Sequence, residues 1–243
     1  MGFTFLVYKY NISHKGNYAM QLEITNDDIT KTIIKSQHCQ RNWDLSQEIP
    51  AEDLKVLVDC VTQCPSKQNI AFYKAHFISN RETIQAIYDN TDGFTINYNP
   101  HQTTKNTQCL ANLLVVFEKH DYTQDQNLSD DGIPRTDQTY QIMKDGAPNA
   151  LTTWVMERDC QLAVGVAAGY LNLSASLMGY ATGCCSCFYP EGVQEVLGIN
   201  GTPLLLMGIG FSDADTNRRV HHEDRDFIFP TKKKQPIEVK FIK

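Results

Sequence analysis

The residues of this sequence that could do chemistry most directly are its cysteines. The chain has 8 of them, and Cys184, Cys185 and Cys187 fall within one short segment. Structural zinc sites favour two pairs of ligands, with the members of each pair two to four residues apart. Cys60 and Cys64 form another close pair and could suggest such a site. The segment from Cys184 to Cys187 fits the required spacing poorly, however, so we predict no metal ligands. A reactive thiol of low pKa is the alternative to cysteines that only pack.

A second candidate cluster is the run His221, His222, Glu223 and Asp224. Neighbouring side chains of an extended or helical segment point in different directions, which disfavours a metal site. We expect the run to be solvated surface. No Ser-His-Asp set and no pair of carboxylates stands out elsewhere, so the sequence predicts no catalytic side chain of the acid, base or nucleophile kind.

The element that must position any site is the stretch from Asp159 to Val193, which is small and apolar with almost no charge. Apolar residues mark one helical face from Cys160 to Met178 and a second face from Ala163 to Leu177. An amphipathic surface helix keeps its apolar positions to one stripe. We therefore predict a core helix that is buried nearly all round.

Small residues along this helix, Gly165 and Gly169 among them, would let another helix backbone approach closely. Gly183 is the predicted C-terminal stop, followed by a turn that contains the three cysteines. The run is nearly long enough to span a membrane. Asn172 and several serines interrupt it, however, and no basic cluster flanks it, so a core helix is favoured over a membrane span.

The composition predicts one soluble domain over residues 1–243. The net charge of −6 argues against a nucleic-acid surface, which needs clustered lysine and arginine. The one basic run, Lys232 to Lys234, is best interpreted as a solvated tail. The N-terminus lacks the features of a secretory signal, so we expect a cytoplasmic protein with reduced thiols.

Strand and helix patterns alternate along the chain, which indicates an α+β or α/β class. A helix is predicted from Asn26, capped by Thr25 or Asn26, with Ile29, Ile33 and Ile34 as its buried stripe. A second helix is predicted to begin at Pro50. The remaining elements are helices over 81–88 and 191–197, strands over 71–78, 113–117, 204–209 and 237–242, a strand or arm over 3–10, and an exposed loop or mobile cover over 123–135.

Four motifs, in chain order, resemble those of the nitroreductase family, and the match runs from about Asp27 to the C-terminus. Gln37 to Trp43, QHCQRNW, lies where the family has R-x-S-x-(R/K)-x-(F/W). The family's P-S-x-x-N is matched by Pro65, Ser66 and Asn69. The later matches are a glycine turn and short helix leading to Leu197-Gly198-Ile199, and the apolar strand with Gly208 and Gly210 before Arg218 and Arg219.

This resemblance implies a three-layer α+β fold with a central, mostly antiparallel sheet flanked by helices. It implies an N-terminal arm over 1–25 and a C-terminal extension over 228–243 that reaches across a dimer partner. The implied activity is that of a flavin mononucleotide (FMN) oxidoreductase, in which hydride passes from NAD(P)H through flavin N5 to a nitroaromatic, quinone or similar small acceptor. The flavin would lie at the homodimer interface, with the long central helices packed together.

The resemblance also implies which residues contact FMN. Arg41 is the first candidate for the phosphate, and Arg219 the second with Arg218 as its rival, because guanidinium groups pair with phosphate oxygens. A surface ion pair with Glu223 or Asp224 is the alternative for the last two. Ser66 and Asn69 suit the ring edge and ribityl chain, and Asn69 would equally serve as a helix C-terminal turn. The other implied contacts are Gln37, His38, Cys39, Pro65, Lys67, Gln108, Cys184, Cys185, Glu191 and Gly192.

The sequence departs from the family pattern where Gln37 replaces the usual arginine and Cys39 the usual serine. By this resemblance we expect the loss of one charged contact to the phosphate and of one hydroxyl contact, although Gln37 can still donate hydrogen bonds and Arg41 keeps the charge. These departures leave two alternatives open. One is a specialised flavin enzyme of the same fold, of the dehalogenase or flavin-destroying type, and the other is a flavin-binding scaffold without turnover.

Overall fold

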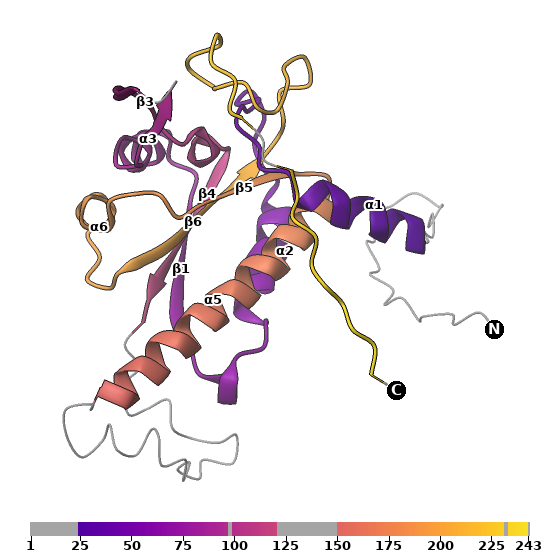
Figure 1. Cartoon of the computed structure of the whole chain (residues 1–243), viewed down its shortest axis with the longest axis vertical. Helices are drawn as coiled ribbons and strands as arrows, with labels where there is room; N and C mark the ends of the chain where they lie inside the picture. The colour runs from indigo at the N-terminus through magenta and orange to yellow at the C-terminus, as the bar shows by residue number, and fades with distance from the viewer. Residues whose placement is uncertain (1–23, 97–98, 121–149, 231–232, 243) are drawn as a thin grey trace.

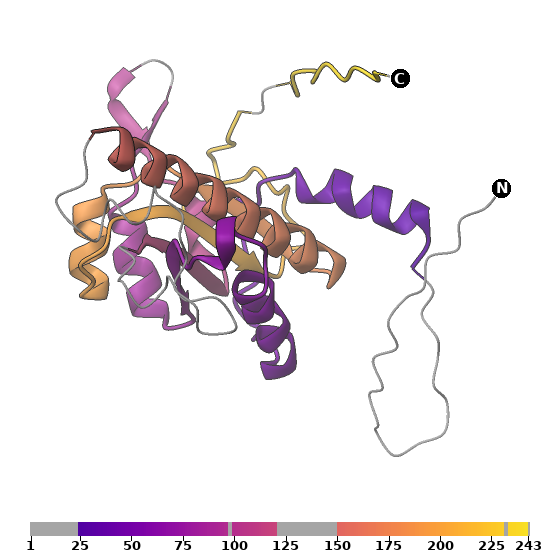
Figure 2. The same ribbon diagram turned by 90° about the horizontal axis from the view of Figure 1, so that it is seen from below.

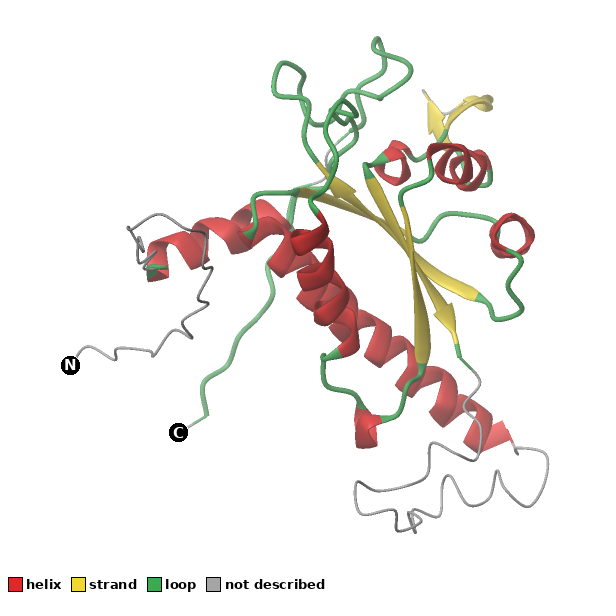
Figure 3. Ribbon diagram, turned by 180° about the vertical axis from the view of Figure 1, so that it is seen from behind, coloured by secondary structure: helices red, strands yellow, loops and turns green. Residues whose placement is uncertain are grey.

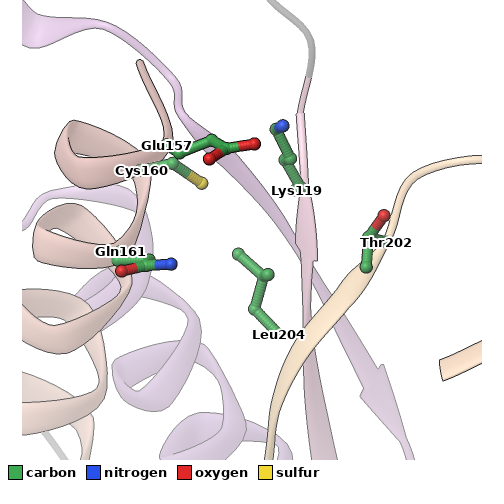
Figure 4. A pocket seen from close by; sticks show the side chains of 6 residues that line it. All are labelled: Lys119, Glu157, Cys160, Gln161, Thr202 and Leu204. Carbon is green, nitrogen blue, oxygen red and sulfur yellow. The ribbon is translucent and has the colours of Figure 1, made fainter. Parts of the chain in front are cut away.

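In the computed structural model of the chain, which describes residues 24–96, 99–120, 150–230 and 233–242, a four-stranded antiparallel sheet lies between two helical layers (Figure 3). The strand order is β1-β4-β6-β5. The predicted three-layer α+β fold is confirmed. The strands are β1 (Tyr73–Ile78), β4 (Leu113–Lys119), β6 (Pro203–Gly210) and β5 (Ala181–Cys185).

Helices of different parts of the chain cover the two faces of the sheet (Figure 1). One layer contains α2 (Ala51–Thr62) and α5 (Ala150–Leu177), with α1 (Asn26–Ser36) packed on α5. The other contains α3 (Arg81–Asp89), α6 (Pro190–Leu197) and the short helix η2 (Thr107–Leu110). A short helix η1 (Lys67–Asn69) precedes β1, and a hairpin of β2 (Phe94–Ile96) and β3 (Asn99–Thr104), which the sequence did not predict, follows α3.

Strand β4 is the centre of the core because its side chains are buried on both faces of the sheet. Leu113, Val115 and Phe117 pack toward α2 and α5, whereas Leu114 and Val116 pack toward α3 and α6. A continuous apolar run bounded by turns is typical of such a strand. The apolar stretch LLVVF therefore predicted a buried strand correctly, and the structure places that strand inside the sheet.

Helix α5 is buried on one face only, so the predicted all-round burial is wrong for a single chain. Ala167, Leu171 and Ala175 are fully buried against the sheet. On the opposite face Leu162 is 61% exposed and Tyr170 is 51% exposed. The exposed apolar side chains recur every four residues and thus form one ridge of the helix. This ridge is an apolar surface that the single chain leaves uncovered.

The end of α5 differs from the prediction. The helix ends at Leu177, and the chain turns at Gly179, whose φ of 97° favours glycine. Gly183, the predicted stop, lies inside β5, where an added Cβ would come within 2.6 Å of the Gln108 Cβ. Cys184 and Cys185 are likewise strand residues rather than turn residues.

The first two helices confirm their predicted positions but differ in detail. Thr25 caps α1, with a reciprocal capping box to Asp28. The isoleucines predicted to be its buried stripe, Ile29, Ile33 and Ile34, are instead exposed in the single chain. Pro50 is the N-cap of α2 and not its first helical residue.

The C-terminal segment contradicts the predicted last strand. Residues 233–242 have no regular secondary structure, and their apolar side chains are exposed, Phe241 by 89%. The segment runs away from the body of the chain (Figure 2). The predictions for residues 3–10 and for the loop 123–135 fall outside the described residues.

One helical stretch of the described chain, Met156–Leu177 within α5, is long and apolar enough to cross a membrane by length and composition. Its buried face contributes Val164, Ala167 and Leu171 to the core beside the sheet. The apolar composition of the stretch is thus partly explained by packing within the chain.

Glu118 is a buried carboxylate near the end of β4 that contacts β1 on one side and the chain just before β6 on the other. It is 2% exposed, lies 2.6 Å from His76 Nε2, and accepts a 2.8 Å bond from the Gly201 amide. Burial by itself would raise the pKa of Glu118, but these bonds and the charge of Lys74 lower it below its usual value.

We expect Glu118→Gln to lower the free energy of unfolding by about 1–3 kcal/mol at neutral pH, since it removes the charge that its partners stabilise. A lowered folded-state pKa gives stability that is present above the ordinary pKa of 4.5 and lost as the pH falls through the folded-state value. The difference between variant and wild type in urea unfolding should therefore shrink below pH 4.5. A difference that is constant down to pH 3 would contradict this role.

Candidate functional site

The segment that carries the first predicted motif lies along the edge strand of the sheet. Cys39 forms a parallel bridge with Thr182 of β5, and the Gln40 amide donates a 2.8 Å hydrogen bond to the Thr182 carbonyl. The Arg41 amide in turn donates to the Arg218 carbonyl at 2.9 Å. The segment is therefore held between β5 and the chain that follows β6. Gln37 and His38, at the end of α1, are exposed.

Arg41 is the centre of a polar cluster. Its Nη1 donates to Asn106 Oδ1 at 3.2 Å and also to Gln108 Oε1. The Gln108 amide nitrogen donates to the Cys184 carbonyl at 3.2 Å. Asn106 and Gln108 are buried, so their amides must be satisfied within the protein. Three predicted contact residues, Arg41, Gln108 and Cys184, are thus brought together from three distant segments.

Only one nitrogen of the Arg41 guanidinium is used by this cluster. Within the described residues its Nε and Nη2 have no hydrogen-bond partner, and its carbon lies 4.2 Å from the centre of the Phe229 ring. An arginine edge with two N–H groups fits two oxygens of a carboxylate or phosphate. The arrangement could therefore hold an anion without breaking the bonds to the two amides.

Two further arginines add positive charge that is not neutralised. Arg218 Nη1 donates to the Cys39 carbonyl at 3.1 Å, and Arg219 Nη1 donates to the Phe229 carbonyl at 3.4 Å. Neither forms an ion pair with Glu223, Asp224 or any other carboxylate of the described chain, so the alternative of a surface ion pair is not supported. Arg218, the predicted rival, is the one that contacts the motif segment.

The start of α6 is connected to this cluster through main-chain contacts. Gly192 packs so closely on Asn90 that an added Cβ would collide with the Asn90 side chain. The Asp92 amide donates to the Cys187 carbonyl at 2.8 Å, and Asn106 Nδ2 donates to the Asp92 carbonyl at 2.7 Å. Glu191 and Gly192 therefore lie on the same side of the sheet as Arg41. The Glu191 side chain is exposed.

The second predicted motif lies elsewhere. Lys67 pairs with Asp159 of α5 at 2.9 Å, and Ser66 Oγ donates to the Ile70 carbonyl at 2.9 Å. Asn69 has a φ of 54°, which suits the turn that the sequence offered as its alternative role. The first motif instead lies beside the C-terminal half of α5, where the Asn172 side chain donates a hydrogen bond to the Ser36 carbonyl.

Along the α5 axis, Asp159 and Asn172 are separated by about 20 Å. Pro65, Ser66, Lys67 and Asn69 are therefore not brought together with Arg41 within one chain. The two motifs can share one ligand only if a second subunit supplies one of them.

The cysteines near Arg41 differ in their pKa shifts, and two of them disfavour the thiolate. Burial raises the pKa of the Cys39 thiol, and a hydrogen bond to Cys185, together with burial, raises that of Cys109 well above its usual value. The same bond lowers the pKa of Cys185. A thiolate at Cys39 or Cys109 is thus disfavoured at neutral pH. The described residues contain no group of three side chains that could hold a metal ion.

Sequence reasoning missed several residues of the cluster, above all Asn106 and Phe229. Asn106 is 6% exposed and receives bonds from both Arg41 and Gln108. Its position two residues before Gln108, just ahead of a buried strand, was the available signal. Nothing in the sequence indicates that Phe229 lies over Arg41, because the two are far apart along the chain.

In the run His221 to Asp224 the two acidic residues are exposed as predicted, but the two histidines are not solvated surface. His221 is 3% exposed and its Nδ1 accepts the amides of Glu223 and Asp224 at 3.1 and 2.8 Å. His222 is half-buried, and its Nδ1 accepts the Trp43 amide at 3.2 Å. The two rings therefore bond to different parts of the chain. Because each Nδ1 accepts a hydrogen bond from a backbone N–H, it carries no proton of its own. We therefore assign both rings as neutral, with the proton on Nε2.

Acid is expected to loosen the segment 217–229, which we call the strap. Burial lowers the pKa of His221, and the positive charge of Arg41 lowers it further, whereas the negative charges of Glu223 and Asp224 oppose this shift. Burial also lowers the pKa of His222. The stability is therefore present above the ordinary pKa of 6.5 and is lost as the pH falls through the lowered folded-state value. Hydrogen exchange of the strap amides between pH 7.5 and pH 5 should report this loss.

The matched variant for this test is His221→Asn, whose side-chain oxygen can accept the same amides but does not titrate. It should flatten most of the pH dependence, leaving the contribution of His222. An equal acid response in the variant would assign the effect to other groups.

Comparison with known proteins gives a consistent result. The sequence model of the nitroreductase family matches residues 34–211. No curated protein sequence matches the chain significantly. A protein of Exiguobacterium sibiricum, described as a nitroreductase and solved in complex with FMN, is similar in structure with a TM-score of 0.59 and 17% identity, over 81% of this chain and 92% of that one.

Two further solved structures are also similar to the chain. One is YdfN of Bacillus subtilis, described as a nitroreductase, with a TM-score of 0.59 and 16% identity over 89% of this chain and 99% of that one. The other, from Staphylococcus epidermidis, is described as an NAD(P)H:FMN oxidoreductase, with a TM-score of 0.54 and 15% identity over 82% and 92%. The family match covers most of the chain, and the fold agrees with it. The chain therefore belongs to the nitroreductase family and is an oxidoreductase by class.

Proposed function

We propose that the protein is an FMN-dependent oxidoreductase that passes a hydride from NAD(P)H to a nitroaromatic, a quinone or a similar small acceptor. The observation that carries the proposal is the Arg41 cluster, in which a guanidinium with an unused edge lies beside two buried amides in a chain of net charge −6. Family membership and the FMN complex of a structural relative support the same ligand.

The residues present fit FMN by their chemistry. Arg41 and Arg218 offer unpaired positive charge for a phosphate, and Arg218 stands next to the segment where Gln37 has replaced a charged side chain. Gln108, Asn106 and the Cys184 main chain offer both donors and acceptors, as a flavin ring edge requires. When bound, FMN would supply the hydride-transfer chemistry. The protein would supply binding, orientation and exclusion of water.

We propose further that the active form is a homodimer. The two motifs lie at opposite ends of the exposed α5 ridge, about 20 Å apart. If two α5 helices cross in antiparallel sense near Gly165 and Gly169, the Lys67 end of one subunit lies beside the Arg41 end of the other. The exposed side chains of Leu162, Val166 and Tyr170 would then be covered. A cytoplasmic location, where NAD(P)H is available, remains part of the proposal.

The test is the visible absorbance spectrum of the purified protein, followed by release and identification of the chromophore. FMN near one equivalent per chain, with oxidation of NADH or NADPH in the presence of a quinone or nitroaromatic, is the expected result. Bound FMN without turnover would favour the flavin-binding scaffold, an alternative to which the replacements at Gln37 and Cys39 give weight. Absence of any flavin after reconstitution would refute the proposal.

A further inference from the structure

The strap places an aromatic ring against the one arginine that is central to the candidate site. Phe229 is 2% exposed, and the Arg41 guanidinium carbon lies 4.2 Å from its ring centre. The two residues belong to segments that meet only in the folded chain. A desolvated contact between a guanidinium and an aromatic face is attractive because of the ring quadrupole.

The position of Phe229 is fixed by the backbone of the strap. The Phe229 amide donates to the Arg219 carbonyl at 2.8 Å, and the His221 amide donates to the Phe227 carbonyl at 2.9 Å. Val220 and Ile228 form an antiparallel bridge between these bonds. The two ends of the strap are therefore paired, and the ring of Phe229 is carried by a closed hairpin-like segment.

Neighbouring rings hold the side chain of Phe229 as well. His221 stacks on it with ring centres 5.6 Å apart and an interplanar angle of 15°. Phe227 meets it edge to face at 5.0 Å. Phe229 is thus immobilised by the strap before any ligand binds, and its free choice of rotamer is already lost.

Arg41 is consequently held on two sides. The amide oxygens of Asn106 and Gln108 bind Nη1, while the Phe229 ring lies against the guanidinium carbon. Neither contact uses the Nε and Nη2 edge. A side chain that is pre-positioned in this way loses less conformational entropy when it binds an anion than a freely rotating arginine would.

We propose that Phe229 is a positioning residue, which holds the Arg41 guanidinium with its free edge available to the phosphate of FMN. This inference rests on the proposed function, because it takes FMN as the ligand. It assigns to the strap a part in ligand recognition, although Phe229 itself donates no hydrogen bond to the ligand.

The experiment compares two ligands that differ only in the phosphate. Apo-protein is titrated with FMN and with riboflavin, and the Kd of each is read from quenching of flavin fluorescence. Phe229→Leu removes the aromatic face and keeps an apolar side chain, whereas Phe229→Tyr keeps the face. Ile228→Ala is the matched control, because Ile228 lies beside Phe229 in the same strap but its side chain is 51% exposed.

The expected result is that Phe229→Leu weakens FMN binding by roughly tenfold while riboflavin binding is unchanged. Phe229→Tyr should restore most of the FMN affinity, and Ile228→Ala should leave the ratio of the two affinities as in the wild type. A variant that merely misfolds would weaken both ligands together.

Equal losses for FMN and riboflavin in Phe229→Leu would overturn the inference, since the strap would then be a general structural element. Unchanged affinity for both ligands would overturn it too. A wild-type protein that binds neither flavin would refute the proposed function itself, and this outcome is visible before any variant is made.

Discussion

Replacement of Gly165 by leucine is expected to convert the protein into a monomer that no longer retains FMN. Within the chain, nothing lies within 4 Å of a Cβ added at Gly165 or Gly169, so the side chain meets no obstacle in the single subunit. Leucine is also a better helix former than glycine by about 0.5–1 kcal/mol. Any loss must therefore arise where another chain approaches α5.

The size of the effect follows from close helix packing. A leucine forced between two backbones costs typically about 1–3 kcal/mol, and a two-fold interface contains the substitution twice. We expect the dimer dissociation constant to rise by at least roughly thirtyfold. Molar mass from light scattering and flavin absorbance of the same fraction would measure both consequences, and Gly169→Leu should behave alike.

Glu195→Leu is the control for this experiment. It places the same side chain at an exposed position of α6, in the helical layer on the other face of the sheet. It should leave mass and FMN content unchanged. A Gly165→Leu monomer that keeps FMN at wild-type affinity would mean that one chain holds the complete site, contrary to the 20 Å separation of the motifs estimated from about 1.5 Å of rise per residue.

Arg41→Met should weaken FMN binding by roughly a hundredfold and also destabilise the fold. The substitution removes a charged donor whose hydrogen bonds are individually worth about 1.5–3 kcal/mol. It also leaves the oxygen of Gln108 without its donor, in a place that water does not reach freely. We expect the free energy of unfolding of the apo-protein to fall by about 1–3 kcal/mol.

Arg219→Met separates a specific contact from a general field of positive charge. The substitution Arg219→Met removes one positive charge from the same neighbourhood. Among the described residues, however, the Arg219 guanidinium donates a hydrogen bond only to the Phe229 carbonyl. Titration with FMN and urea unfolding of both variants would measure the two effects. Similar losses of FMN affinity in the two variants would favour unspecific electrostatic attraction, and wild-type affinity in Arg41→Met would remove this residue from the site.

Local patterns were sufficient to predict most of the elements. The run LLVVF predicted β4 because burial on both faces demands apolar residues at every position. Thr25 and Asp28 form their capping box within one turn, so it needs no distant partner. The order of the motifs was likewise readable, and it predicted the family to which the chain belongs.

Errors arose where a pattern is satisfied by something outside the local sequence. Ile29 and Tyr170 have the apolar character of buried residues, yet they are exposed in the single chain. Periodicity reports that a face is apolar, but it does not report what covers it. Residues 237–242 alternate like a strand and form none, because a strand also needs a neighbour that supplies its hydrogen bonds.

The fold class and the family could be predicted from the sequence, because they depend on local periodicity and on motifs in a fixed order. Which of the candidate contact residues lie together could be read only from the folded chain. It joined Arg41 to Asn106, Gln108 and the strap, and it separated Ser66 and Asn69 from them along α5. The physical reason is that such contacts depend on how the sheet and helices pack, which residues distant in sequence decide together.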